Sequence, residues 1–271
     1  MKKFWKKTSL FLVTAAMTVS APLMAWALEH DIVILHTNDI HCGINDNIGF
    51  AGLAQIKKDA LARTPNVALV DAGDAIQGAP IGKLSRGLAV VDIMNYLGYD
   101  FCIPGNHEFD YGMDRFMELV PLQRAGYYCA NFVYAGNNKQ VLPGYKIMQY
   151  EDTKVAFVGA STPESLTTST PTFFQNEKGQ YIYSFCEDKS GSKLYKQLQK
   201  NVDKARKEGA DYVFIVGHLG MDGTTPQWNS ENVAKNTQGV DAVIDGHSHE
   251  RFTRMVKNKV GKDCLLYTSD A

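Results

Sequence analysis

The sequence lacks several features that would point to a membrane protein, a nucleic-acid-binding protein or a zinc-ribbon protein. No apolar run approaches the roughly 20 residues that a membrane helix needs. The net charge is −1, the pI is about 6.6 and no basic stripe is present, which argues against a nucleic-acid partner. The five cysteines include no C-x-x-C pair, which excludes a zinc ribbon and a thioredoxin motif. What remains is a chain of 271 residues with 45% apolar residues and no internal repeat, which is ordinary globular composition.

Residues 1–27 have the pattern of a secretory signal peptide. Four lysines precede an apolar run from Leu10 to Val19, and Ala25-Trp26-Ala27 provides a small-x-small cleavage site. An uncleaved anchor is the alternative, but the run is too short to span a bilayer. Cleavage leaves 24 basic and 29 acidic residues, a net charge of −5. We therefore expect an exported protein without a membrane span, located in the periplasm, outside the cell or at its surface.

Apolar runs alternate with helical patterns along the rest of the chain. The runs, which end at glycine, aspartate or another polar residue and predict buried strands, lie at residues 31–35, 67–70, 100–103, 155–158, 212–216 and 240–244. The helical patterns lie at residues 53–63, 90–97, 113–124 and 192–208. This alternation predicts a layered α/β fold with mainly parallel strands. The stretch from Pro163 to Lys189 has no clear period and is expected to be a long loop.

Polar residues that can bind metals fall directly after five of these strands. The groups are Asp39-x-His41, Gly73-Asp74, Gly105-Asn-His-Glu108, Gly217-His218 and Gly246-His-Ser-His249, and they contain five of the seven histidines. Sites in open α/β folds form outside the carboxyl ends of the strands, so we expect these groups to converge. Histidine with carboxylate and amide oxygens, without a thiolate, suits Zn, Mn or Fe(II).

The number of these side chains exceeds what one tetrahedral ion can bind. We therefore expect two divalent metal ions that share a carboxylate. Such a centre carries positive charge toward its ligand and suits a small-molecule phosphate ester.

The motifs resemble those of the calcineurin-like metallophosphoesterases, and most closely the secreted 5′-nucleotidase and UDP-sugar hydrolase family. The resemblance covers about residues 31–255 and is carried by ILHTNDIH at 34–41, DAGD at 71–74, PGNHEFD at 104–110, GHLG at 217–220 and DGHSH at 245–249. It implies a layered α/β metallophosphatase sandwich with a dinuclear metal site at the carboxyl ends of the strands.

The resemblance also implies which residues form the metal site. The side chains that would bind the first ion are Asp39, His41 and His249. The side chains that would bind the second ion are Asn106, His218 and His247. Asp74 would bridge the two ions.

Two further residues acquire catalytic roles from the resemblance. His107 would act on the phosphoryl group or the leaving oxygen. Asp110 lies three residues later and could orient His107 and raise its pKa. Asp110 could also cap the helix expected from Met113.

Other reactive residues have simpler interpretations. His36 is expected to be structural, and His30, beside the cleavage site, is expected to be exposed. Glu108 is expected to support the ligands instead of binding a metal. Cys42 is interpreted as a packing residue, and Ser248 has no evident base that would make it a nucleophile.

The function implied by the resemblance is hydrolysis of 5′-nucleotides to nucleosides and phosphate by attack of a metal-bound hydroxide. UDP-sugars, 2′,3′-cyclic nucleotides and a metal-binding but inactive fragment remain alternatives. Family members carry a second, nucleotide-binding domain, so residues 28–271 are expected to be a catalytic domain alone. We do not expect Cys264 to Ala271 to continue its sheet, which would leave an exposed edge.

Overall fold

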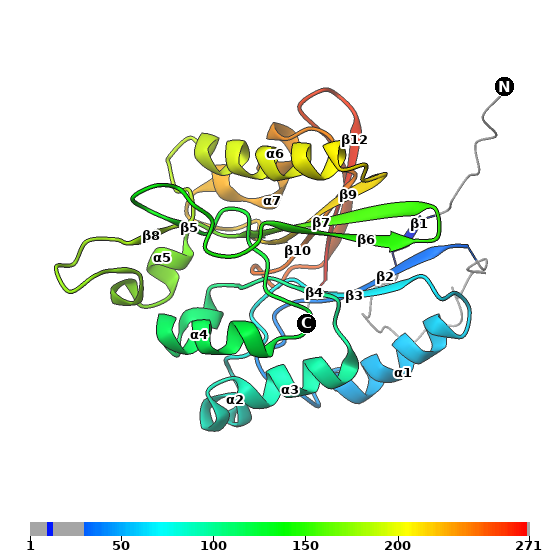
Figure 1. Ribbon diagram of the computed structural model, residues 1–271, viewed down its shortest axis with the longest axis horizontal. Helices are drawn as coiled ribbons and strands as arrows, with labels where there is room; N and C mark the ends of the chain where they lie inside the picture. The colour runs from blue at the N-terminus through cyan, green and yellow to red at the C-terminus, as the bar shows by residue number, and fades with distance from the viewer. Residues whose placement is uncertain (1–9, 13–29, 270–271) are drawn as a thin grey trace.

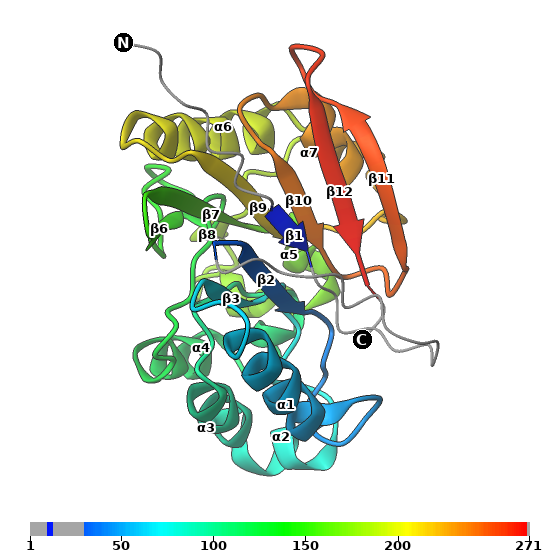
Figure 2. The ribbon, with the colours of Figure 1, turned by 90° about the vertical axis from the view of Figure 1, so that its right-hand side faces the viewer.

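Two β-sheets face each other, and helices cover the outer side of each sheet (Figures 1 and 2). The computed structural model describes residues 10–12 and 30–269. The predicted leader, residues 1–27, therefore lies outside the described residues except for its residues 10–12. Within the described part of the chain, no helix combines the length and apolar character that crossing a bilayer requires.

The first sheet contains four parallel strands in the order β1-β2-β3-β4. Their bounds are β1 (Leu10–Leu12), β2 (Ile32–Thr37), β3 (Val67–Asp71) and β4 (Phe101–Cys102). The helices on its outer side are α1 (Gly49–Leu61), α2 (Pro80–Ser85), α3 (Leu88–Leu97) and α4 (Met113–Leu119).

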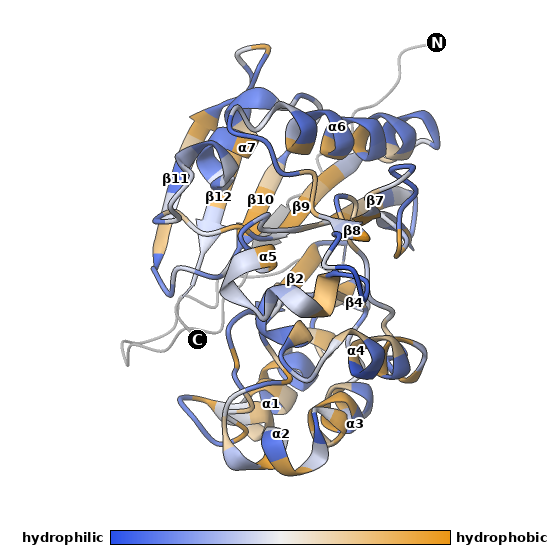
Figure 3. Cartoon of the chain, turned by 90° about the vertical axis from the view of Figure 1, so that its left-hand side faces the viewer, coloured by the Kyte–Doolittle hydropathy of each residue, from blue (hydrophilic) through white to orange (hydrophobic). Residues whose placement is uncertain are grey.

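The second sheet contains six strands in the order β11-β12-β10-β9-β7-β6. The inner strands are parallel, and the two edge strands β6 and β11 run antiparallel to their neighbours. The strands are β6 (Tyr145–Tyr150), β7 (Thr153–Ser161), β9 (Tyr212–His218), β10 (Ala242–Asp245), β11 (Phe252–Lys257) and β12 (Asp263–Thr268). The helices on its outer side are α6 (Ser192–Lys207) and α7 (Ser230–Asn236), whose polar faces point away from the sheet (Figure 3).

Alternating side chains build three apolar layers from these strands. On β2, Ile34 packs between the two sheets, whereas Leu35 packs toward the helices of the first sheet. On β7, Phe157 packs between the sheets and Val158 packs toward α6 and α7. Because successive strand residues point to opposite faces, a strand covered on both sides must be apolar throughout. The predicted layered α/β sandwich with mainly parallel strands is confirmed.

The stretch expected to be a long loop contains several short elements. They are α5 (Ser165–Thr168), η3 (Pro171–Phe174) and β8 (Tyr183–Ser184), and β8 pairs with β5 (Val133–Tyr134). The helix predicted at residues 113–124 ends at Leu119, and the chain continues as the 3-10 turn η2 (Val120–Leu122). Pro121 explains this change, because it has no N–H to donate inside an α-helix.

The expectation about the last residues was wrong. Asp263–Thr268 forms β12, which pairs with β10 on one side and β11 on the other. Cys264 and Leu266 are fully buried, because this short apolar run fits a strand that is covered on both faces. The edge strand next to β12 is β11, where Arg254 and Lys257 form ion pairs, and charged residues disfavour edge-to-edge association.

A core substitution tests this layering. Phe157 is fully buried between the sheets and contacts Phe101 and Phe214 through its ring. Phe157→Ala is expected to lower the free energy of unfolding by about 3–5 kcal/mol in urea denaturation, because it leaves a cavity. Tyr96 is 90% exposed on α3, and Tyr96→Ala is the control, with an expected change below about 0.5 kcal/mol. Equal losses in the two variants would contradict the placement of Phe157.

Candidate metal centre

The nine side chains predicted for the site lie together where the carboxyl ends of strands from both sheets meet. Hydrogen bonds between the sheets show this convergence directly. The backbone N–H of His247, which follows β10, donates to the Asp39 carboxylate after β2, with N···O distances of 2.9 and 3.1 Å. His218, at the end of β9, contacts the carbonyl of Ala72 after β3 at 2.8 Å.

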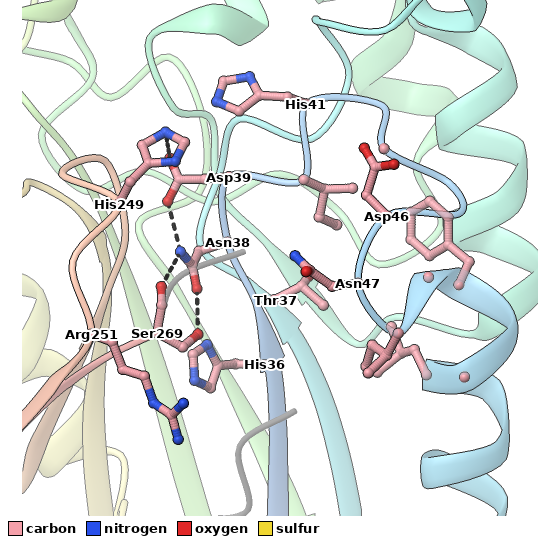
Figure 4. Close-up of a pocket in the computed structure, with 17 residues that line it drawn as sticks. His36, Thr37, Asn38, Asp39, His41, Asp46, Asn47, His249, Arg251 and Ser269 are labelled. Atoms are coloured by element: carbon pink, nitrogen blue, oxygen red, sulfur yellow. Dashed lines mark hydrogen bonds and ion pairs between the residues drawn. The ribbon is translucent and has the colours of Figure 1, made fainter. Parts of the chain in front are cut away.

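A first group of potential ligands contains Asp39, His41 and His249 (Figure 4). One ligand atom from each residue lies within 4.8 Å of the others. The His249 Nε2 is 3.6 Å from the Asp39 Oδ1, and the His41 and His249 rings stack with centroids 5.4 Å apart. The Nδ1 of His41 lies 3.1 Å from the carbonyl of Gln77. If this nitrogen donates to the carbonyl, the Nε2 of His41 is left as an acceptor that can bind a metal.

A second group contains Asp74, His218 and His247, again with ligand atoms within 4.8 Å of one another. The His218 Nε2 lies 3.0 Å from the Asp74 Oδ2 and 3.2 Å from the His247 Nδ1. The amide oxygen of Asn106 is 3.3 Å from the same His218 nitrogen. Donation from the His218 Nδ1 to the carbonyl of Ala72 turns its Nε2 toward this group.

The carboxylate of Asp74 lies between the two groups. Its Oδ2 is 3.0 Å from the His218 Nε2 and 3.9 Å from the His41 Nε2. Its Oδ1 accepts a hydrogen bond from the backbone N–H of His107 at 2.8 Å. One oxygen atom therefore faces both groups, which is the position that a bridging ligand requires.

The charges at the centre are strongly coupled. Burial lowers the pKa of His218, but the carboxylates of Asp74 and Asp39 outweigh it and raise that pKa to about 10. Burial raises the pKa of Asp74, but His218 outweighs it and lowers that pKa below its usual range. Burial and the charge of His218 lower the pKa of His247 to about 4. The buried carboxylates thus stabilise positive charge at this place, whether it is a proton or a metal ion.

Most of the predicted ligands have an unusual backbone conformation. Asp39, His41, Asp74, His247 and His249 have φ between 47° and 82°, in the left-handed region. Each such residue costs on the order of 1–3 kcal/mol unless the surrounding structure enforces it, and such strain clusters at functional sites. The sharp turns let a short segment after each strand present its side chain to the centre.

Gly105 allows two of these segments to approach closely. A Cβ atom at Gly105 would lie 2.2 Å from the Asp74 Oδ1, so a larger residue would displace the carboxylate. Glycine permits this close approach because it has no side chain.

Glu108 supports the segments that carry the potential ligands, as expected, by accepting hydrogen bonds from their backbone. It belongs to neither group of potential ligands. Its Oε2 accepts from the backbone N–H groups of Asp74 (2.8 Å) and Gly105 (2.6 Å). Its Oε1 accepts from those of Ala75 (2.8 Å) and Ile76 (3.2 Å). One buried carboxylate therefore connects the segments that follow β3 and β4.

His107 and Asp110 form a pair beside the centre. The His107 Nδ1 is 2.6 Å from the Asp110 Oδ2, and this hydrogen bond raises the pKa of His107. The hydroxyl of Ser169 donates to the other Asp110 oxygen at 3.0 Å. The alternative that Asp110 caps the next helix is wrong, because α4 begins after Gly112 and has no side-chain cap.

Burial agrees with the interpretation of Cys42 as a packing residue and of His30 as an exposed one. His36 and Cys42 are buried, and His30 is exposed. All five cysteines are buried and free. The Ser248 hydroxyl accepts a hydrogen bond from the N–H of Met221 at 3.3 Å.

Sequence reasoning missed the groups that hold the ligands in place. The Asn38 side chain donates to the Asp39 Oδ2 at 2.7 Å and to the carbonyl of Ser269. Its position directly before a predicted ligand was the available signal. The carbonyls of Ala72 and Gln77 carried no signal, because every residue has a carbonyl group.

Glu108→Gln tests whether this residue clamps the centre. Each oxygen of the Glu108 carboxylate accepts from two backbone N–H groups. A glutamine amide has only one oxygen, so two of these four buried N–H groups lose their acceptor. We expect the variant to lose about 2–4 kcal/mol of unfolding free energy in chemical denaturation. Glu118 is exposed on α4, and Glu118→Gln should stay within about 0.5 kcal/mol of the parent. If the Glu108 variant were as stable as this control, the clamp would have no energetic role.

The chain is similar to known proteins over most of its length. The family model described as calcineurin-like phosphoesterase matches residues 32–251. The human 5′-nucleotidase is 30% identical over 280 residues, covering 95% of this chain and 45% of the relative. A 2′,3′-cyclic-nucleotide 2′-phosphodiesterase/3′-nucleotidase from Haemophilus influenzae is 27% identical and is matched over 88% of this chain and 40% of its own length. The chain thus spans less than half the length of these curated relatives.

Solved structures share the fold. The 5′-nucleotidase precursor of Thermus thermophilus has a TM-score of 0.72 and 25% identity, covering 88% of this chain and 48% of that protein. The calcineurin-like phosphoesterase YfkN of Bacillus subtilis has a TM-score of 0.68 and 26% identity, covering 81% of this chain and 72% of that one. Because the family model matches most of the chain, this protein belongs to the calcineurin-like phosphoesterase family, a family of metal-dependent phosphoric ester hydrolases.

Proposed function

We propose that the protein hydrolyses nucleotide phosphate esters, and 5′-nucleotides in particular, at a centre of two divalent metal ions. The observation that carries the proposal is the buried Asp74 oxygen that faces both groups of histidines. Residues 28–271 act in this proposal as one catalytic domain, exported after removal of residues 1–27. That removal takes away β1 and leaves β2 as the edge strand of the first sheet.

The donor atoms suit two metal ions. In our assignment, the residues of the first site are Asp39, His41 and His249, and those of the second are Asn106, His218 and His247. Asp74 is shared between the sites. Imidazole nitrogens with carboxylate and amide oxygens suit Zn, Mn or Fe. When bound, such ions lower the pKa of water and stabilise the charge of the phosphoryl group.

His107 supplies the proton in the proposed reaction. The hydrogen bond to Asp110 raises its pKa and so favours the protonated form of the ring. Since the Nδ1 faces Asp110, the Nε2 is the nitrogen that would give its proton to the leaving oxygen as the P–O bond breaks. Water supplies the oxygen that joins phosphorus, so no covalent enzyme intermediate is formed. Ser169 fixes Asp110 and thereby the orientation of the ring.

The substrate assignment is supported by the names of relatives. Several are 5′-nucleotidases, including one from the venom of Gloydius brevicauda that is 28% identical, and a venom enzyme is consistent with export. The Haemophilus influenzae relative supports 2′,3′-cyclic nucleotides as the second candidate substrate class. A panel of AMP, a 2′,3′-cyclic nucleotide, a UDP-sugar and an aryl phosphate separates these possibilities.

Asp74→Ala tests the shared ligand. Removing it takes a ligand from both sites, so the purified variant should lose both metal ions and its turnover of p-nitrophenyl phosphate. Metal content is measured by inductively coupled plasma mass spectrometry, and folding by circular dichroism. Asp92→Ala, which removes an exposed carboxylate on α3, is the control and should retain both metals. Two metals per chain and full activity in the Asp74 variant would refute the assignment.

His107→Ala separates proton transfer from metal binding. We expect kcat for AMP to fall by roughly 10²–10⁴-fold, the usual contribution of general acid–base catalysis. Metal content should stay unchanged, because His107 is in neither set of ligands. His30→Ala, at an exposed position, should leave both quantities unchanged. A His107 variant with normal kcat would remove this residue from the mechanism.

A further inference from the structure

An open groove of about 1080 Å³ lies beside α6, on the outer side of the second sheet. It runs along this helix, between the end of α7 and the segments around β5 and β8. The face of α6 that is turned away from the sheet is hydrophilic (Figure 3). Of the described residues that line the groove, none is a potential metal ligand. The groove is therefore separate from the metal centre.

Four lysines line this groove, although the whole chain has a net charge of −1. Three of them, Lys193, Lys196 and Lys200, lie on one face of α6, because they are three and four residues apart. The fourth, Lys259, lies in the turn between β11 and β12. One acidic residue, Asp203, is also in the lining. The fold thus gathers a basic cluster that the overall charge conceals, and it corrects the expectation that no basic stripe is present.

The ammonium groups of these four lysines form no ion pair within the described part of the chain, although all four residues are exposed. Nearby lysines are paired: the Lys235 Nζ is 2.6 Å from the Glu231 Oε1, and the Lys257 Nζ is 2.6 Å from the Asp263 Oδ1. Like charges three or four residues apart destabilise a helix, so helix stability does not explain the lysines on α6. An anionic partner in the groove would offset their repulsion.

The uncharged part of the lining favours one class of anionic partner. It consists mostly of amide and hydroxyl side chains, which can donate and accept hydrogen bonds, from Asn138, Ser184, Ser192, Gln197, Gln199 and Asn236. Such groups suit the hydroxyl and ring oxygens of sugars. Tyr195 is the only aromatic residue among the described ones that line the groove, whereas grooves for single-stranded nucleic acids use several aromatic side chains on which the bases stack.

The apolar face of α6 disfavours an anionic bilayer as the partner. A helix that lies on a bilayer buries its apolar face in the lipid. On α6, Leu194, Leu198 and Val202 are instead buried in the core beneath the helix. Only the polar face of α6 is left for a partner.

We propose that this groove binds a linear anionic polysaccharide that carries carboxylate or sulfate groups along its chain. Lys193, Lys196 and Lys200 contact this chain over about 10 Å of α6, at 1.5 Å per residue. Lys259 contacts it from the turn between β11 and β12. The inference goes beyond the proposed function and does not depend on it, because the groove shares no residue with the metal centre. Such binding would hold the protein at a surface that displays the polysaccharide and leave the metal centre open to phosphate esters.

The triple variant Lys193→Gln/Lys196→Gln/Lys200→Gln tests the groove. The probe is fluorescein-labelled heparin, a linear sulfated polysaccharide, and its Kd is measured by fluorescence anisotropy at low ionic strength, where surface charges are least screened. The Kd should rise by about tenfold or more, because three charge-assisted contacts are lost. Circular dichroism checks that the variant is folded.

The matched control is the triple variant Lys58→Gln/Lys83→Gln/Lys178→Gln. It removes the same charge from three exposed positions outside the groove, and its Kd for heparin should stay within about twofold of the parent value. Equal losses in the two triple variants, or no heparin binding by the unmodified protein, would overturn the proposal. Tighter binding of polyuridylate or of vesicles that contain phosphatidylglycerol than of heparin would also overturn it, because the partner would then belong to another class.

Lys259→Gln separates binding in the groove from binding along α6 alone. Lys259 is far from the α6 lysines in sequence and joins them only in the folded chain, so the Kd for heparin should rise by about threefold or more. Lys262→Gln, at an exposed position three residues later, is the control and should leave the Kd unchanged. An unchanged Kd in the Lys259 variant would contradict the placement of the polysaccharide in the groove.

Discussion

The buried carboxylate of Asp74, held between two groups of histidines, is the interaction on which the rest of the site depends. A carboxylate removed from water is costly unless it is paired, and here His218 is the partner in direct contact with it. The protein supports this arrangement with backbone groups: Glu108 ties the segments after β3 and β4 together, and Gly105 leaves space for the Asp74 oxygen. A metal ion at each group would add the positive charge that this anionic centre favours.

The sandwich architecture explains why the two groups can lie so close. Parallel strands of both sheets end at the same side, so short segments from β2, β3 and β4 meet segments from β9 and β10. The left-handed backbone at Asp39 and His249 shows how sharply these segments turn. The apolar layer between the sheets is rigid and close-packed, and it fixes the distance across which the ligands face one another. The favourable packing of the core thus offsets the energetic cost of the left-handed backbone conformations at the metal centre.

Much of this arrangement could be predicted from the sequence. Apolar runs such as 67–70 mark buried strands by themselves, and ligand-type residues directly after them mark where the strands end. The pairing of His107 with Asp110 followed from a spacing of three residues. Other features depend on contacts between distant segments: β12 needs β10 and β11 as neighbours, and the tautomer of His218 depends on the carbonyl of Ala72. That His36 has no hydrogen-bond partner within residues 30–269 is likewise visible only once its surroundings are known.

The most direct test of this account is the position of bound metal in crystals of the protein grown with Mn²⁺, measured by anomalous scattering. The account predicts two peaks per chain. One should lie among Asp39, His41 and His249, the other among Asn106, His218 and His247, with the Asp74 carboxylate between them. A well-folded protein without a peak at either place, in saturating Mn²⁺, would contradict the assignment of a dinuclear centre.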